Sequence, residues 1–157
     1  MGIFFIVVGV IGLACILMYN SLISKKNQVD NIFGSVDAVL KQRYDLIPNL
    51  VATAKEYMTH ERETLEKITA LRSQAMSGNL DTNTKMELDT KISKALGGLM
   101  VAVENYPDLK ANENFLHLQH TLNELEEHIA AARRAYNQSV TDYNNAIEMF
   151  PTNIMAG

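Results

Sequence analysis

The chain opens with an unbroken apolar segment. No charged side chain occurs between Met1 and Ser24, and the run extended to Ile23 covers 21 residues. As a helix, this run is roughly 31 Å long at about 1.5 Å per residue, which matches a hydrocarbon core of roughly 30 Å. We therefore predict a transmembrane anchor over residues 1–24. Its apolar side chains are Ile3, Phe4, Phe5, Ile6, Val7, Val8, Val10, Ile11, Leu13, Ile16, Leu17 and Met18.

Three other interpretations of this segment are weaker. A cleaved signal peptide needs a positively charged start, a shorter apolar core and a small-x-small cleavage site. A lipid-modified Cys15 is preceded by Ala14, but Gly12 stands where a large aliphatic residue is usual, and the apolar run continues past the cysteine. A buried helix of a soluble protein needs a polar stripe, which this segment lacks. Tyr19 then occupies the position of an interfacial aromatic belt.

Residues 25–157 show helical spacing and are predicted to form one helical domain. The first apolar stripe runs from Val29 to Leu40 and continues the membrane helix. Because proline removes a backbone donor and disfavours a helical residue before it, we expect a break at 45–48. Further helices are expected over about 48–75, with an apolar stripe from Val51 to Leu71, and over about 84–105, with an apolar stripe from Leu88 to Val103. A polar turn at 77–83 separates them. Gly97-Gly98 inside the third helix suggests a close crossing with a neighbouring helix or a kink, rather than a ligand-binding backbone.

The last expected helix, from Phe115 to Phe150, has the most regular pattern in the chain. Its apolar residues recur at steps of three and four with one extra step of four, which is a heptad-like seam with a stutter. Long helices joined by short loops pack as antiparallel neighbours. The predicted fold class is therefore all-α: an N-terminal transmembrane helix that continues into an elongated antiparallel bundle of about four long helices with coiled-coil-like packing.

The net charge, the single cysteine and the basic residues after the anchor each limit what the chain can bind or form. The net charge of the 157 residues is −4 with mixed signs, so nucleic acid is not an expected partner. The lone Cys15 cannot form an internal disulfide. Lys25 and Lys26 follow the apolar segment, with Lys41 and Arg43 further on. By the positive-inside rule, these basic residues predict a cytoplasmic helical domain with the N-terminus outside.

The histidines are the candidates for metal chemistry. His60-Glu61 begins a zinc-protease pattern, but Thr64 stands where that pattern needs its second histidine. His117 and His120 share a helix face, and with Glu124 they have the donor types that zinc prefers. A solvated polar face is the favoured interpretation, because these histidines lie off the apolar stripe. We expect no metal and no cofactor.

No other pattern indicates catalysis. The sequence lacks a nucleophile elbow and a phosphate-binding glycine loop, and it has no thiol outside the apolar segment. Arg133 and Arg134 beside Tyr136 are suited to an acidic partner or a lipid headgroup, but pairing with acidic residues of the same helix is favoured. We therefore expect a protein that is not an enzyme and has no catalytic residues.

The chain resembles the LemA family in several long motifs. These motifs lie at residues 42–51, 106–115, 118–119, 131–137, 143–144 and 150–151. The resemblance implies a bacterial, membrane-anchored protein with an antiparallel helical domain and no catalytic residues to carry over. Some relatives are linked to magnetosome membranes, which suggests a role in scaffolding or membrane organisation. The motif residues are Arg43, Tyr44, Pro48, Tyr106, Pro107, Asp108, Asn112, Phe115, Arg133, Tyr136, Asn137, Tyr143, Asn144, Phe150 and Pro151.

Two functions follow from these features. The first is a scaffold in the bacterial inner membrane, with a single span, that binds the lipid bilayer and self-associates as a homo-oligomer. The alternative is an adaptor or accessory subunit of another membrane protein, such as a transporter, protease or signalling complex, with residues 107–114 as a docking loop. Family members usually continue past the Phe-Pro motif with a more polar tail, and this chain departs from that pattern at Gly157.

Overall fold

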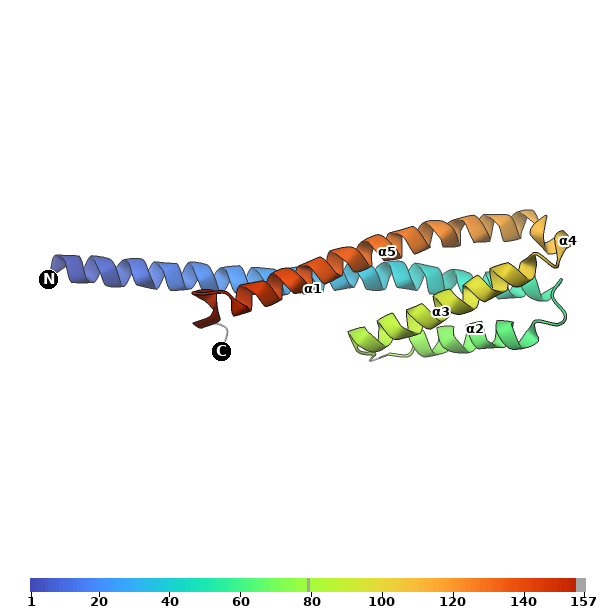
Figure 1. Cartoon of the computed structure of the whole chain (residues 1–157), viewed down its shortest axis with the longest axis horizontal. Coiled ribbons are helices and arrows are strands. Elements are labelled where there is room, and N and C mark those ends of the chain that lie inside the picture. Colours follow the sequence, from blue (N-terminus) through green and yellow to red (C-terminus); the bar gives the residue numbers. More distant parts are fainter. Residues whose placement is uncertain (79, 155–157) are drawn as a thin grey trace. The chain divides into compact units, whose positions relative to one another are not determined.

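The computed structural model describes residues 1–78 and 80–154, and this part of the chain is helical without any strand. The predicted all-α fold class is therefore confirmed. Figure 1 shows the order of the elements along the chain. They are α1 (Gly2–Lys55), α2 (Arg62–Ala75), α3 (Thr82–Val103), α4 (Pro107–Lys110), α5 (Glu113–Glu148) and the 3₁₀ helix η1 (Thr152–Ile154).

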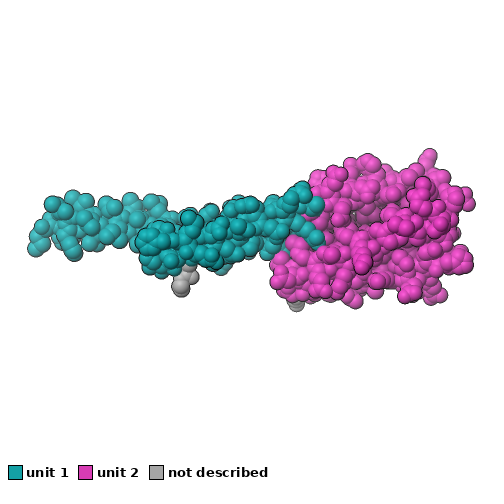
Figure 2. Space-filling model, in the orientation of Figure 1, with its two compact units in different colours: residues 1–37, 130–157 teal, residues 38–129 magenta. Residues whose placement is uncertain are grey.

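The chain divides into two units, coloured separately in Figure 2. Unit 1 contains residues 1–37 and 130–157, and unit 2 contains residues 38–129. Helices α1 and α5 each contribute residues to both units. The boundary expected between an anchor and a helical domain at residue 24 therefore lies within α1, and it stays a prediction.

Unit 2 has a hydrophobic core built from four helical stretches. These are the end of α1, all of α2 and α3, and the beginning of α5, with α2 and α3 packed side by side (Figure 1). The removal of apolar side chains from water, at about 25 cal/mol per Å², is the main stabilising contribution to such a core. Its fully buried side chains include Leu40, Ile47, Leu50, Ile68, Ile92, Leu99, Leu109, Phe115 and Ile129.

The break predicted at Pro48 was wrong, because α1 continues through it to Lys55. Proline 48 has no N–H to donate to the carbonyl of Tyr44, one turn earlier, so that carbonyl loses its helical partner. Arg72 of α2 replaces the missing donor: its Nε lies 2.7 Å from the Tyr44 carbonyl oxygen. Ile47 and Leu50 are fully buried on either side of the proline, so packing also holds the helix together.

The predicted helix over 48–75 is instead two elements. Residues up to Lys55 complete α1, and α2 begins only at Arg62, after a loop that contains Met58 and Glu61. The apolar stripe expected here is buried in its middle, at Ala54, Met58, Leu65 and Ile68, whereas its end residues Val51 and Leu71 are half-buried. Periodicity located the buried face correctly but did not reveal the loop inside it.

The stripe of the third helix is confirmed, whereas the close crossing at Gly97-Gly98 was wrong. Leu88, Ile92, Leu96, Leu99 and Val103 are all buried on one face of α3. A Cβ atom placed on either glycine would meet nothing within 4 Å. Both glycines are exposed and α3 passes through them, so no neighbouring helix requires their small size.

Side-chain caps define two helix starts in unit 2. Asp81 accepts a hydrogen bond from the Thr84 backbone N–H at 3.0 Å at the start of α3. Hydrogen bonds from the side chain and backbone of Thr84 lower the pKa of Asp81 below its ordinary value of 3.8. Asn112 caps α5 in the same way, since its Oδ1 accepts from the Phe115 N–H at 3.0 Å.

Unit 1 pairs the first part of α1 with the last part of α5. Phe33 and Tyr136 contact each other across this pair, with ring centroids 5.7 Å apart. Val36 and Leu22 of α1 are buried, as is Ser139 of α5. Most other seam residues are only half-buried, because a pair of helices covers one face of each helix and leaves its margins open.

Candidate functional site

The first candidate site is the apolar start of α1, which lies in unit 1. In the described part of the chain, α1 is the one helix that is long and apolar enough to cross a membrane, and none of its most apolar window is buried. Met18 is half-buried. The other eleven predicted anchor residues are each 49–80% exposed: Ile3, Phe4, Phe5, Ile6, Val7, Val8, Val10, Ile11, Leu13, Ile16 and Leu17.

Such an apolar surface is unusual for a protein surrounded by water. Monomeric soluble proteins rarely expose contiguous apolar patches above a few hundred Å², and larger patches mark contact with a membrane or another protein. From Phe5 onward, the backbone N–H groups of this segment can donate to carbonyls within the helix, as a lipid environment requires. Its length, composition and exposure together fit a helix surrounded by lipid.

The second candidate site is a cluster of charged side chains in unit 2, centred on Arg43. Its Nη1 atom lies 2.9 Å from Asp89 Oδ1 and 3.0 Å from Glu126 Oε2. Its Nη2 atom donates a hydrogen bond of 2.8 Å to Ser93 Oγ. Ser93 Oγ also lies within hydrogen-bonding range of Glu126, at 3.4 Å. One guanidinium thus joins α1, α3 and α5.

The two carboxylates of this cluster, those of Asp89 and Glu126, differ in their exposure to solvent. The side chain of Arg43 is 3% exposed and that of Asp89 is 1% exposed, whereas the Glu126 side chain is 53% exposed. A buried ion pair costs solvation energy on formation, and losing one partner leaves an uncompensated buried charge. The arrangement therefore fixes the packing of three helices.

Sequence reasoning singled out Arg43 and missed its partners. Asp89 and Ser93 lie one helical turn apart on α3, beside Ile92 of the apolar stripe. The sequence feature that could have pointed to Asp89 and Ser93 is their position, at helical spacing, along the edge of the apolar stripe. The burial of Arg43 also removes it from the set of free basic residues near the membrane segment, so the predicted orientation rests on the lysines.

The motif at residues 106–112 closes one end of unit 2. The Tyr106 hydroxyl donates a hydrogen bond to the Glu61 carboxylate. That bond raises the pKa of Tyr106, since the carboxylate favours the protonated phenol. The Asn112 amide donates to the Tyr57 hydroxyl at 3.1 Å, and Leu109 is fully buried. These contacts tie the loop after α1 to the turns around α4.

The remaining motif residues lie in different settings. Tyr44 is buried in unit 2. In unit 1, Tyr136 packs on Phe33, and Arg133 and Tyr143 are half-buried. Those exposed to solvent are Pro48, Pro107, Asp108, Asn137, Asn144, Phe150 and Pro151. The structure therefore brings the motif residues together at the end of unit 2 and along the helix pair, and it does not gather them into one catalytic centre.

The candidate zinc ligands stay on the surface of α5. His120 Nδ1 lies 3.6 Å from Glu124 Oε2, and both side chains are largely exposed. Among the described residues, no group of three His, Cys, Asp or Glu side chains is placed to hold a metal ion. The pair is an ordinary exposed contact between residues four apart on a helix.

Comparison with known proteins identifies the architecture. The LemA family model matches residues 32–157. Protein LemA of Metamycoplasma hominis is 30% identical over 153 residues, which cover 98% of this chain and 70% of that protein. The chain belongs to the LemA family. The family match begins within α1, after the apolar segment, and includes both the Arg43 cluster and the 106–112 motif.

Shorter similarities extend to magnetosome proteins. Magnetosome protein MamQ 2 of Paramagnetospirillum magneticum is 37% identical to this LemA-family chain over 68 residues. Magnetosome protein MamQ of Magnetospirillum gryphiswaldense is 35% identical over 68 residues. Each match covers 43% of the chain and 25% of the relative, so three quarters of each MamQ protein lie outside the similarity.

Proposed function

We propose that this LemA-family chain is a non-enzymatic scaffold, anchored in the bacterial inner membrane by a single span, that self-associates through its helical domain. The observation that carries the proposal is the continuity of α1 from Gly2 to Lys55. One helix provides an exposed apolar segment long enough to cross a bilayer and then contributes to the core of unit 2. Such a helix couples a folded unit directly to the membrane.

The proposed self-association is supported by the uneven burial of the α5 seam. In unit 2, the seam residues Phe115, Leu122, Leu125 and Ile129 are buried by the chain itself. In unit 1, Val36 and Leu22 of α1 are buried, but most of the other seam residues of the two helices are only half-buried, which leaves apolar area for another helix to cover. These half-buried seam residues are Val29, Ile32, Phe33, Tyr136, Val140, Tyr143 and Ile147.

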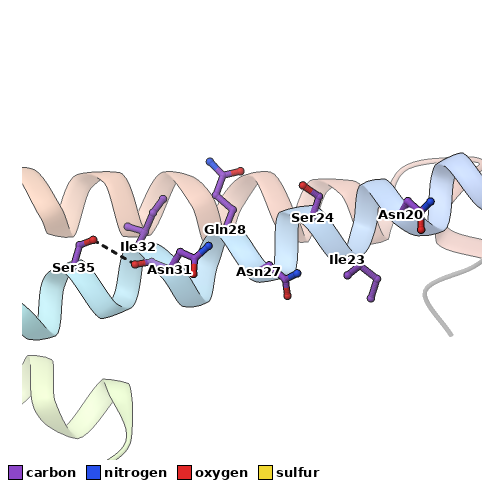
Figure 3. Close-up of a pocket in the computed structure, with 8 residues that line it drawn as sticks. All are labelled: Asn20, Ile23, Ser24, Asn27, Gln28, Asn31, Ile32 and Ser35. Carbon is purple, nitrogen blue, oxygen red and sulfur yellow. Dashed lines mark hydrogen bonds between the residues drawn. The ribbon is translucent and has the colours of Figure 1, made fainter.

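A polar groove on α1 lies beside this seam. Figure 3 shows its lining side chains along one face of the helix. Their polar members carry amides and hydroxyls without charge, so they can hydrogen-bond to a second copy without desolvating an ion. Polar residues at helix interfaces also fix the register of the partners. The groove measures about 680 Å³ and is lined by Asn20, Ile23, Ser24, Asn27, Gln28, Asn31, Ile32 and Ser35.

The mass of the full-length particle in mild detergent tests the proposal. Light scattering that separates protein from detergent is expected to give one defined multiple of the 17.5 kDa chain. The physical reason is that covering the half-buried seam removes apolar area from water. A particle with the mass of one chain at all accessible protein concentrations would contradict self-association.

Cysteine crosslinking locates the contact. In a Cys15→Ser background, Gln28→Cys places a thiol in the groove of unit 1, and a short bismaleimide is expected to give dimers in native membranes. Val101→Cys is the matched control, because Val101 is 74% exposed on α3 of unit 2. Equal crosslinking at both positions would show random collision, and dimers at position 101 alone would move the interface to unit 2.

The alternative function, an adaptor for another membrane protein, is favoured by a second groove in unit 2. This groove, of about 680 Å³, lies between the end of α1 and α2 and includes Val51, Met58 and Leu65 among its lining residues. A monomeric particle in detergent, together with a crosslink from α2 to one other membrane protein, would support the adaptor over the scaffold.

The orientation of the chain is a separate prediction. With Lys25 and Lys26 flanking the span, we expect unit 2 to lie in the cytoplasm. The Val101→Cys variant, in the Cys15→Ser background, should resist a membrane-impermeant maleimide in intact spheroplasts and react after permeabilisation. Labelling at full extent in intact spheroplasts would place unit 2 on the outer side.

A further inference from the structure

An exposed apolar turn follows α5 in unit 1. Met149 is 63% exposed, Phe150 is 79% exposed and Ile154 of η1 is 70% exposed. Backbone hydrogen bonds fold this turn back on itself, from Asn153 N–H to the Met149 carbonyl at 2.8 Å and from Ile154 N–H to the Pro151 carbonyl at 3.2 Å. We refer to residues 149–154 as the apolar turn.

The pairing of the two helices fixes the level of this turn along α1. Phe33 and Tyr136 are in contact, and the two helices run in opposite directions (Figure 1). Phe150 is fourteen residues after Tyr136, and Tyr19 is fourteen residues before Phe33. At about 1.5 Å per residue, Tyr19 lies about 21 Å from the ring contact, and the end of α5 at Glu148 lies about 18 Å from it in the same direction, with Phe150 two residues further on.

The burial pattern agrees with this register. The same counting brings Ile147 level with Leu22, and Leu22 is 7% exposed although it lies inside the predicted anchor of residues 1–24. Figure 1 shows the dark red end of the chain beside the blue part of α1. The apolar turn therefore reaches the level at which the apolar segment of α1 ends.

We propose that the apolar turn inserts into the interfacial region of the same bilayer, beside Tyr19, as a second membrane contact. Aromatic side chains are enriched at this depth, and apolar groups of interfacial segments lie about 5–10 Å into the headgroup and acyl boundary. The proposal rests on the membrane span proposed above, because that span sets the level of the interface. Lipid is the occupant because it surrounds α1 at this level.

The charged residues nearby fit this placement. Lys25 and Lys26 are six and seven residues beyond Tyr19, which places them about 9–10 Å further toward water. Glu148, the last residue of α5, is exposed and precedes the turn. The apolar residues of the turn thus extend beyond the charged residues of the helix pair in the direction of the bilayer.

Tryptophan fluorescence provides the test, because the chain contains no tryptophan. Full-length Phe150→Trp protein is reconstituted into phosphatidylcholine vesicles whose acyl chains carry bromine near the headgroup. Its emission is expected to shift to the blue relative to an exposed indole and to lose intensity in the brominated vesicles. Val101→Trp is the matched control on the exposed surface of α3 and should show neither change.

A third variant separates this inference from the span itself. Leu13→Trp lies within the apolar segment and should be quenched by lipid brominated deep in the acyl chain. If Leu13→Trp is quenched and Phe150→Trp is not, the turn lies outside the bilayer and the inference is wrong. If neither is quenched, the proposed span is wrong as well. A blue shift of Phe150→Trp without bromine quenching would mean that protein covers the turn, which also overturns the inference.

Discussion

Asp89→Ala is expected to lower the free energy of unfolding by about 3–5 kcal/mol. The Asp89 side chain is 1% exposed and lies 2.9 Å from Nη1 of Arg43, which is itself 3% exposed. Removing the carboxylate leaves the guanidinium buried without its buried counter-charge. Urea denaturation of the full-length protein in mild detergent, followed by helical circular dichroism, measures the loss.

Glu126→Ala is the matched control for this prediction. Glu126 lies 3.0 Å from the same Nη1 atom, but its side chain is 53% exposed, so its loss should cost about 0–1 kcal/mol. An equal, small loss in both variants would show that burial does not set the strength of this cluster. Combining Arg43→Met with Asp89→Leu should cost less than Asp89→Ala, because it removes both charges at once.

The Arg43 cluster shows where sequence reasoning ends. The resemblance to the LemA family drew attention to Arg43, and the apolar stripe of α3 correctly predicted which face of that helix is buried. Asp89 sits inside that buried region, but an apolar pattern carries no information about a charge whose partner lies 46 residues away. Only the tertiary arrangement reveals that Asp89 and Arg43 pair with each other.

Pro48 shows the same limit of sequence-based prediction for secondary structure. The expected break follows from a local rule, namely that proline leaves the carbonyl one turn earlier without its donor. In unit 2, that carbonyl belongs to Tyr44 and accepts from Arg72, 28 residues away in sequence. The loop before α2 was missed for the opposite reason, since its residue Met58 is buried as if it belonged to a helical stripe.

The apolar seam of α5 has regular spacing in the sequence, but its burial in the structure differs between its first and last parts. The same spacing of three and four runs from Phe115 to Phe150. Its first part is covered by three other helical stretches in unit 2, and its last part by α1 alone in unit 1. Periodicity predicts an apolar face but not how many helices cover it. The proposed self-association and the proposed lipid contact both concern the part that is covered least.

Deletion of residues 2–24 is expected to release the protein from membranes completely. Each Leu, Ile, Phe or Val near the centre of a span contributes about 0.3–0.6 kcal/mol to insertion, and eleven such predicted anchor residues are exposed in this segment. Their combined contribution is on the order of 5 kcal/mol. Membrane flotation followed by a carbonate wash should move the protein from the membrane fraction to the soluble fraction.

The deletion variant still carries the apolar turn and a complete unit 2, whose core lies within residues 38–129. The urea concentration at which unit 2 is half unfolded, measured by helical circular dichroism, should therefore be the same in the deletion variant as in the full-length protein. The apolar turn alone cannot retain the protein, since stable attachment needs more than one weak lipid contact.

Lys25→Gln with Lys26→Gln is the control, and it should stay in the membrane because the span is intact. Retention of the deletion variant through the carbonate wash would show that the main attachment lies outside α1, because the missing segment is the one long apolar helix among the described residues.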